Sequence, residues 1–217
     1  MKNPIDNYWQ LRLQELKLKL DANNFEAFIA SDLAEAEELI VEKLVPAANP
    51  QTVSYGGSMT LKEMGALDRI EGMEGVELLR PDVPGLSGKD KIERKRQGLL
   101  VDLYLTGTNA VTEDGQLVNL DMIGNRVAAI TFGPKKVIIV VGRNKIVADL
   151  EMAMHRIKDY AAPANTMRLD MKTPCVKTST CVECSSPGRI CNYWTITEKA
   201  FPKSRIAVIL INEDLGL

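Results

Sequence analysis

The sequence has very few of the residues on which several common reaction mechanisms depend. Among its 217 residues there is one histidine, His155, and there are only four cysteines. His155 stands beside Glu151, Lys158 and Asp159, away from the apolar side of the helix expected there, so we expect a surface residue. A Ser-His-Asp triad or a histidine-rich metal site is therefore not expected.

Long apolar runs are also lacking. No stretch approaches the roughly 20 apolar residues that cross a membrane, and residues 1–10 lack the apolar core of a signal peptide. The net charge of −2 gives no reason to expect nucleic-acid or membrane binding. We therefore expect a cytoplasmic protein, in a compartment where thiols stay reduced.

What is present is an ordinary globular composition, 45% apolar and 26% charged, which is enough for a buried core. The length fits one domain, assigned here to residues 1–217. Strand-like and helix-like segments alternate along the first half. The expected helices cover 6–22, a segment from Ser31 or Asp32 to a stop at Pro46, and the stretch through Leu61, Met64 and Leu67; the strands cover 25–30, 52–55 and 76–79.

A polar helix is expected over 87–98, and its basic side chains at 91–96 are interpreted as a solvated face. Apolar strands follow at 101–112, 116–121 and 136–142, with a tight turn at 112–115. Next comes a helix with Leu150, Met154, Ile157 and Ala161 on its apolar side, and strands at 193–197 and 205–211 close the chain. Alternating strands and helices predict an α/β class with a mostly parallel sheet.

One long block resembles a known protein family. Residues 106–147 read TGTNAVTEDGQLVNLDMIGNRVAAITFGPKKVIIVVGRNKIV, and GGSMTL at 56–61 and RKRQG at 94–98 add to the likeness. These segments resemble the LUD-domain family, the lactate-utilisation proteins related to lactate-utilisation protein C. The resemblance extends over nearly the whole chain.

The resemblance implies an open, mostly parallel sheet with helices on both faces, like the group of ribose-5-phosphate isomerase, glucosamine-phosphate deaminase and CoA-transferases. In such sheets, ligands bind at the loops between strands and helices. Family members occur with iron–sulfur oxidoreductase subunits in systems that oxidise L-lactate to pyruvate. Such subunits are the expected protein partners.

Two groups of residues are candidates for binding a small anionic ligand. The first follows a strand and opens a helix, where glycines admit a ligand and backbone N–H groups attract anions. The second supplies amides and a guanidinium fork beside apolar strands, and Lys145 could face the same cleft. The candidates are Gly56, Gly57, Ser58 and Thr60 in the first group and Gly107, Asn109, Asn119, Asn125 and Arg126 in the second. Helix capping by Ser58 and by Asn125 is the structural alternative.

Glu113 is the one candidate catalytic residue. In related CoA-transferases a glutamate followed by Asn-Gly is the nucleophile, and Glu113-Asp114-Gly115 resembles that feature with Asp in place of Asn. The favoured interpretation of Glu113 is nevertheless a carboxylate in a turn.

All four cysteines fall in one loop-like segment, residues 173–192, called the cysteine segment below. Cys175, Cys181, Cys184 and Cys191 have the spacing C-x5-C-x2-C-x6-C. Four thiolates form a complete shell for a soft metal, and the spacing matches neither a zinc ribbon nor a ferredoxin run. A [4Fe–4S] cluster is the favoured interpretation; zinc, and thiols without a metal, are the alternatives.

Three functions follow, in order of preference. The first is a component of a redox system for lactate or a similar 2-hydroxy acid, with a small anion in the cleft and an iron–sulfur cluster on the cysteines. The second is a binding or regulatory module with structural zinc or redox-sensing thiols. The third is a transferase or isomerase that acts on a CoA ester or a sugar phosphate through Glu113.

Overall fold

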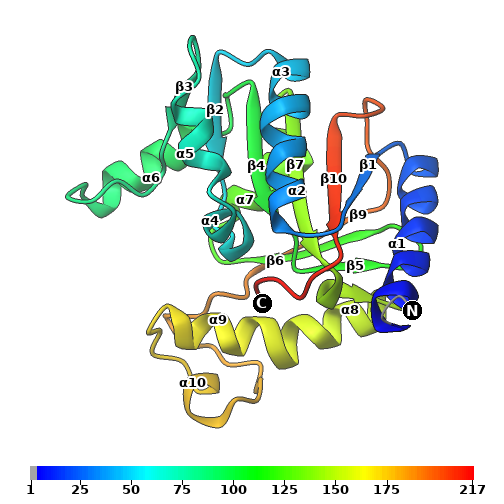
Figure 1. The fold of residues 1–217 in the computed structure, drawn as a ribbon. Coiled ribbons are helices and arrows are strands. Elements are labelled where there is room, and N and C mark those ends of the chain that lie inside the picture. Colours follow the sequence, from blue (N-terminus) through cyan, green and yellow to red (C-terminus); the bar gives the residue numbers. More distant parts are fainter. Residues whose placement is uncertain (1–3) are drawn as a thin grey trace.

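Residues 4–217 are described by a computed structural model, in which two β-sheets are surrounded by helices (Figure 1). The α-helices are α1 Pro4–Ala22, α2 Leu33–Glu38, α3 Val45–Ala48, α4 Met59–Met64, α5 Ala66–Glu71, α6 Gly88–Gln97, α7 Asn125–Thr131, α8 Leu150–Arg156, α9 Ala162–Arg168 and α10 Cys175–Thr178. Two π-helical segments, η1 Leu39–Leu44 and η3 Ile157–Ala161, and one 3₁₀ turn, η2 Arg143–Lys145, connect some of them. The strands are β1 Glu26–Ala30, β2 Thr52–Tyr55, β3 Glu77–Leu79, β4 Leu103–Gly107, β5 Ala110–Thr112, β6 Leu117–Asp121, β7 Lys136–Gly142, β8 Ile146–Val147, β9 Tyr193–Thr197 and β10 Ile206–Ile211.

The main sheet has six strands in the order β1-β10-β7-β4-β2-β3, and every pair in it is parallel. Its central strands are apolar on both sides, because each side is covered. Along β7, Val137 and Ile139 face one core, and Ile138 and Val140 face the other. Strand β10 divides its side chains between the same two cores.

Helices cover both faces of this sheet. Helices α1 and α7 contribute Leu13, Leu16 and Ile130 to one core. Segments α2 to α5 contribute residues such as Ile40 and Leu61 to the other. The expected α/β class, an open and mostly parallel sheet with helices on both faces, is confirmed.

A second sheet of four strands, in the order β8-β5-β6-β9, lies between the main sheet and the α8–α9 helix (Figure 1). The tight turn expected at 112–115 joins its antiparallel strands β5 and β6, and the amide of Gly115 donates to the Thr112 carbonyl at 2.9 Å. The single strand expected over 101–112 is wrong, because the chain leaves the main sheet after Gly107 and enters the second sheet at Ala110.

Two further expectations about helices are corrected. Pro46 does not end its helix; it stands in the first turn of α3, where no backbone N–H is needed, and Asn49 in the left-handed region (φ 42°) ends the helix instead. Met154 is 37% exposed and is not on the buried side of α8, which Ala153 and Ile157 form. Among residues 4–217, no helix is long and apolar enough to cross a membrane.

Candidate functional site

A cleft of about 400 Å³ opens beyond the carboxyl ends of the central strands. Its walls come from the loops after β2, β4 and β7, with Ser58, Thr108 and Lys145 among their residues, and from α9 through Ala162 and Arg168. Parallel sheets expose backbone groups at this edge, which is where ligands bind in open α/β folds. We call this space the cleft.

The structure brings most of the predicted ligand residues to the cleft. Those that line it are Gly57, Ser58, Gly107, Asn109, Asn125 and Arg126. The other three, Gly56, Thr60 and Asn119, are buried and do not line it. The two predicted groups of residues therefore meet in space, although about 50 residues separate them along the chain.

Gly56 has a packing role. A Cβ atom placed on Gly56 would lie 2.7 Å from Thr106 Oγ1 and 3.1 Å from Arg126 Cγ, which is too close for any side chain. The next hydroxyl, Ser58 Oγ, accepts from the Leu61 amide at 3.3 Å and so caps α4, as the structural alternative proposed. This loop therefore shapes the cleft chiefly through its backbone.

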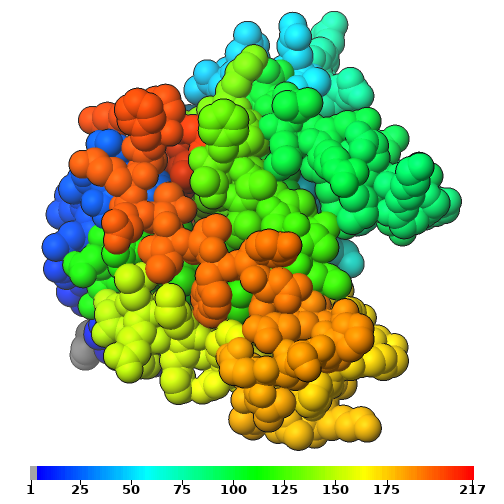
Figure 2. Space-filling model, turned by 180° about the vertical axis from the view of Figure 1, so that it is seen from behind, coloured from blue at the N-terminus to red at the C-terminus, as the bar shows by residue number. Residues whose placement is uncertain are grey.

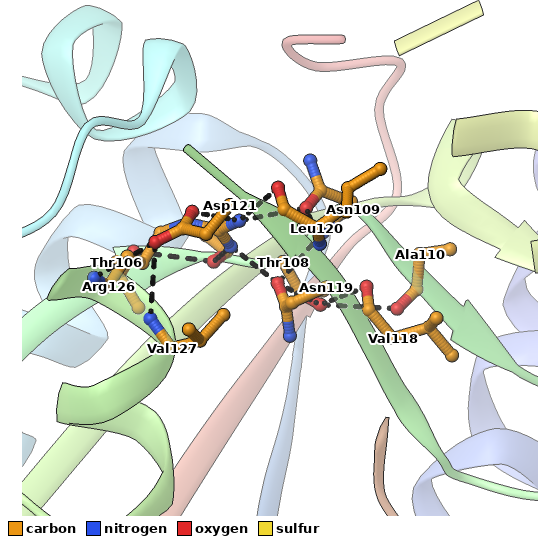
Figure 3. Close-up of polar contacts among 11 residues, drawn as sticks. Thr106, Thr108, Asn109, Ala110, Val118, Asn119, Leu120, Asp121, Arg126 and Val127 are labelled. Atoms are coloured by element: carbon orange, nitrogen blue, oxygen red, sulfur yellow. Dashed lines mark hydrogen bonds and ion pairs between the residues drawn. The ribbon is translucent and has the colours of Figure 1, made fainter. Parts of the chain in front are cut away.

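Arg126 is the centre of a buried polar network (Figure 3). Its Nε donates to Asp121 Oδ1 at 3.0 Å, its Nη1 donates to the Gly107 carbonyl at 3.1 Å, and its Nη2 donates to Asn109 Oδ1 at 2.8 Å. Nη1 also donates to Asn119 Oδ1. We call these five residues the Arg126 network.

The network ties the end of β4 to β6 and α7. Because every nitrogen of the guanidinium already donates to a protein acceptor, Arg126 has no free fork for a ligand carboxylate. The Asn109 and Asn119 carboxamide oxygens are likewise occupied by donors from the protein. The geometry gives these residues a positioning role in the cleft wall.

Lys145 differs from Arg126 in this respect. Its side chain is only 6% exposed and lines the cleft, and its ammonium makes no hydrogen bond or ion pair with the residues from 4 to 217. Burial, followed by the positive charges of Arg156 and Arg126, lowers the pKa of Lys145 to about 8, and Glu63 opposes this shift. A buried cation without a partner is costly, which marks Lys145 as a candidate functional residue.

A second unsatisfied polar group lies next to Lys145. The hydroxyl of Thr60 is buried and has no hydrogen-bond partner among the described residues. Gly216 lies against both groups, since a Cβ atom there would be 3.1 Å from Thr60 Oγ1 and 3.3 Å from Lys145 Nζ.

The charged residues that line the cleft are mostly basic. Asp82 and Asp121 are the two acidic ones, and each pairs with a basic lining residue, Lys95 at 3.3 Å and Arg126 at 2.9 Å. Lys145 and Arg168 are left without a carboxylate partner in the described part of the chain. The cleft is therefore suited to an anion.

Glu113 does not reach the cleft. It lies in the turn between β5 and β6, where its amide donates to the Val147 carbonyl at 2.9 Å and its half-exposed carboxylate pairs with Arg12. His155, the single histidine, is at the surface and its Nε2 lies 2.9 Å from Asp159 Oδ2. Neither residue lines the cleft.

The four cysteines surround one enclosed space of about 20 Å³, called the thiol pocket below. All four are free thiols and are partly buried. The cysteine segment forms the edge of the molecule beside α9 (Figure 2). In this conformation no three Cys, His, Asp or Glu side chains of residues 4–217 form a ready metal-binding group.

Two basic residues border the thiol pocket. The Arg189 guanidinium donates to the carbonyls of Cys184 at 2.7 Å and Cys191 at 2.9 Å and so holds the turn between them. Burial raises the pKa of the Cys191 thiol, and the charges of Lys158 and Arg189 act in the opposite direction. Burial is the larger effect, so the neutral Cys191 thiol is favoured when no metal is bound.

The donor set of the thiol pocket suits a soft metal such as zinc or iron in an iron–sulfur cluster. The thiol pocket also adjoins the cleft, because Ala162 and Ile190 line both.

Comparison with known proteins identifies the family. The model of the LUD domain matches residues 13–211. The chain belongs to the LUD domain family. This confirms the resemblance and associates the chain with lactate utilisation at the level of the family. Comparison with curated proteins gives no match.

Among solved structures, this LUD domain is similar to a DUF162 family protein from Deinococcus radiodurans. The two are 15% identical, the match covers 94% of this chain and 98% of that chain, and the TM-score is 0.50. This likeness supports the fold alone. Partial matches to ribose 5-phosphate isomerase from Plasmodium falciparum and eIF2B delta from Chaetomium thermophilum have 15% and 19% identity. They cover 52% and 56% of this chain and 52% and 51% of those chains, and their TM-scores of 0.31 and 0.30 carry no argument.

Sequence reasoning gave too little weight to the basic residues of the cleft. The sequence indicates that Lys145 could face the cleft but assigns it no role, and it does not single out Arg168. Lys95 is expected on a solvated face, although it lines the cleft. The available signal was the position of Lys145 directly after β7, at the carboxyl end of a buried parallel strand.

Proposed function

We propose that this LUD domain binds a small carboxylate, of the class of lactate and other 2-hydroxy acids, in the cleft and acts as a component of a 2-hydroxy acid utilisation system. The observation that carries the proposal is the presence of two cations, Lys145 and Arg168, that line a small cleft without a carboxylate partner. A ligand carboxylate supplies the missing negative charge.

The walls of the cleft support a ligand of this size. The Arg126 network fixes one wall, and on another wall the Lys145 ammonium has no partner among residues 4–217. A small hydroxy acid offers a carboxylate and a hydroxyl, which together can satisfy a cation and a polar neighbour.

The proposal includes a metal on Cys175, Cys181, Cys184 and Cys191, with an iron–sulfur cluster as the first choice. An iron–sulfur cluster supplies one-electron transfer when bound. The support is the all-thiolate donor set that faces one space and the shared wall of Ala162 and Ile190 between that space and the cleft. Iron–sulfur oxidoreductase subunits are the partners that such a component needs.

A zinc-stabilised or redox-sensing module is the second candidate. The four free thiols that line one space support it, because a shell of four thiolates also holds a single zinc ion. A transferase that uses Glu113 receives no comparable support, since Glu113 lies away from the cleft.

Isothermal titration calorimetry tests the proposed ligand class. L-lactate is titrated into the full chain beside lactamide, in which an uncharged amide replaces the carboxylate. We expect lactate to bind at least about tenfold more tightly than lactamide, since a charge-assisted hydrogen bond contributes about 1.5–3 kcal/mol. Equal binding of both compounds, or no binding of lactate, would contradict the proposal.

Lys145→Met and Lys62→Met form a matched pair for the same titration. Both remove one lysine charge, but Lys62 is exposed on α4 and is not part of the cleft. We expect Lys145→Met to weaken lactate binding by at least about tenfold and Lys62→Met to leave it unchanged.

A further inference from the structure

We propose that Lys145 forms an imine with the carbonyl carbon of a 2-oxo acid held in the cleft. The inference deepens the proposed function and rests on it, because a 2-oxo acid has the carboxylate that the cleft is proposed to bind. It adds a covalent step and names the residue that performs it.

The position of Lys145 carries the inference. The side chain is 6% exposed, it lines the cleft, and its amine has no hydrogen-bond or ion-pair partner among residues 4–217. The other basic residues of the cleft wall are engaged: Arg126 with Asp121, Lys95 with Asp82, and Arg168 with Asn165. Lys145 is therefore the amine that is free to react.

The surrounding charges favour the reactive form of this amine. Arg156 on α8 and Arg126 on α7 both act to lower the pKa of Lys145, which burial brings to about 8, while Glu63 on α4 acts to raise it. Near pH 7.5, such an amine is neutral on the order of 100-fold more often than an exposed lysine. Desolvation and neighbouring cations are a known way to make a lysine nucleophilic.

One remaining group matches the carboxylate of a 2-oxo acid. Arg168 lines the same cleft without a carboxylate partner and provides a cation for the ligand carboxylate. The Thr60 hydroxyl lies beside the same glycine as Lys145 Nζ but is buried and does not line the cleft, so it is not assigned a contact with the acid. Arg168 thus binds the carboxylate of the acid, and the Lys145 amine reacts with the adjacent carbonyl group.

The step balances without an oxidant or a reductant. The lone pair of Nζ forms a bond to the carbonyl carbon while the π bond of the carbonyl breaks, the oxygen takes up the proton that Nζ loses, and a carbinolamine results. Loss of water from the carbinolamine then gives the imine, and the carboxylate of the acid is unchanged. A 2-hydroxy acid has no carbonyl group and cannot take this step.

Reductive trapping tests the inference. The full chain is incubated with pyruvate and sodium cyanoborohydride near pH 7.5 and analysed by intact mass and peptide mapping. We expect one adduct per chain, with the mass of pyruvate less water plus two hydrogens, located on Lys145. Modification of Lys145 no greater than that of exposed lysines would overturn the inference.

Two variants and one ligand serve as controls. Lys145→Arg keeps a positive charge but cannot form the imine, so it should give no site-specific adduct, and Lys62→Arg should react like the unchanged chain. Thermal unfolding of both variants verifies that they are folded. If Lys145→Arg is not folded, the test is the peptide map of the unchanged chain, which shows whether the adduct is on Lys145. L-lactate should give no adduct under the same conditions.

Calorimetry separates this inference from the proposed function. Binding of L-lactate and pyruvate without an adduct on Lys145 would overturn the imine and leave the proposed function intact. Absence of binding of either acid, together with no adduct, would overturn both.

Discussion

The Arg126 network and the cysteine segment differ in how completely their polar groups are satisfied. Every guanidinium nitrogen of Arg126 donates to a protein acceptor, and the network is held between β4, β6 and α7. The four thiols of the cysteine segment face one space, but in this conformation they form no ready metal-binding group within residues 4–217. In the first region protein acceptors satisfy the whole guanidinium and only Asn119 Nδ2 is buried without a partner among residues 4–217. The second region has the donors that a metal would complete.

This contrast also separates two kinds of basic residue in the cleft. Arg126 is a fixed part of its wall, and Lys145 is a cation without a partner among residues 4–217. Residues that shape a site and residues that contact its ligand thus differ in their hydrogen-bond partners more than in their burial, since both side chains are buried.

The largest expected effect is an all-or-none loss of metal. We expect anaerobically purified protein to contain iron and sulfide, and Cys184→Ser to contain neither at stoichiometric levels. Ser185→Ala, a change at the adjacent exposed position, should keep the metal. Elemental analysis for iron and zinc, with a sulfide assay, measures this. Stoichiometric zinc without sulfide would favour the zinc module, and no metal after anaerobic reconstitution would remove the metal from the account.

The next largest effect is on stability. Arg126→Met removes a buried cation and takes away the side-chain donor that Asp121, Asn109 and Asn119 share. We expect a loss of about 3–5 kcal/mol in the free energy of unfolding, measured by urea denaturation. Arg96→Met, on the exposed helix α6, should change it by less than about 0.5 kcal/mol. A similar small change in both variants would mean that the Arg126 network is not essential to the fold.

Lys145→Met should raise the free energy of unfolding, whereas Arg126→Met should lower it. The lowered pKa of about 8 means that below that pH the folded protein bears the full penalty of a buried charge. We expect the variant to be more stable by about 3 kcal/mol near pH 7, with an advantage that falls to about half that near pH 9.5 as the native amine loses its proton. Urea denaturation at both pH values measures this, and an advantage independent of pH would contradict the assigned cause.

Glu113→Gln should have the smallest effect. The Glu113 carboxylate is half-exposed and its ion pair with Arg12 is at the surface. We expect a change in the free energy of unfolding below about 1 kcal/mol, and unchanged lactate binding in calorimetry. A marked loss of binding would restore Glu113 as a candidate catalytic residue.

Most of the fold could be predicted from the sequence because its strands are short apolar runs separated by clear turn and capping residues. Asp32 and Asp149 cap their helices as expected of such residues, and the continuous apolar run of β7 indicates a strand covered on both sides. The errors arose where local rules allow two outcomes: Pro46 is tolerated in a first turn, and an apolar run does not show that the chain changes sheets after Gly107.

The position of the candidate site could be predicted from the sequence, but the roles of its individual residues could not. Six of the nine predicted ligand residues line the cleft, because the carboxyl ends of parallel strands share one edge; that they bind a ligand stays a prediction. The guanidinium donors of Arg126 are all used, and Lys145 has no partner among residues 4–217. Both facts depend on neighbours from four or more separate segments, which no local sequence pattern encodes.

Proton uptake on ligand binding tests the central claim, that Lys145 is the free cation of an anion-binding cleft, most directly. L-lactate is titrated calorimetrically near pH 8.5 in two buffers with different ionisation enthalpies. Because an anion raises the pKa of Lys145 from about 8, we expect an uptake of about half a proton or more per lactate bound, and none in Lys145→Met. Lactate binding without proton uptake, or equal uptake in the variant, would contradict the account.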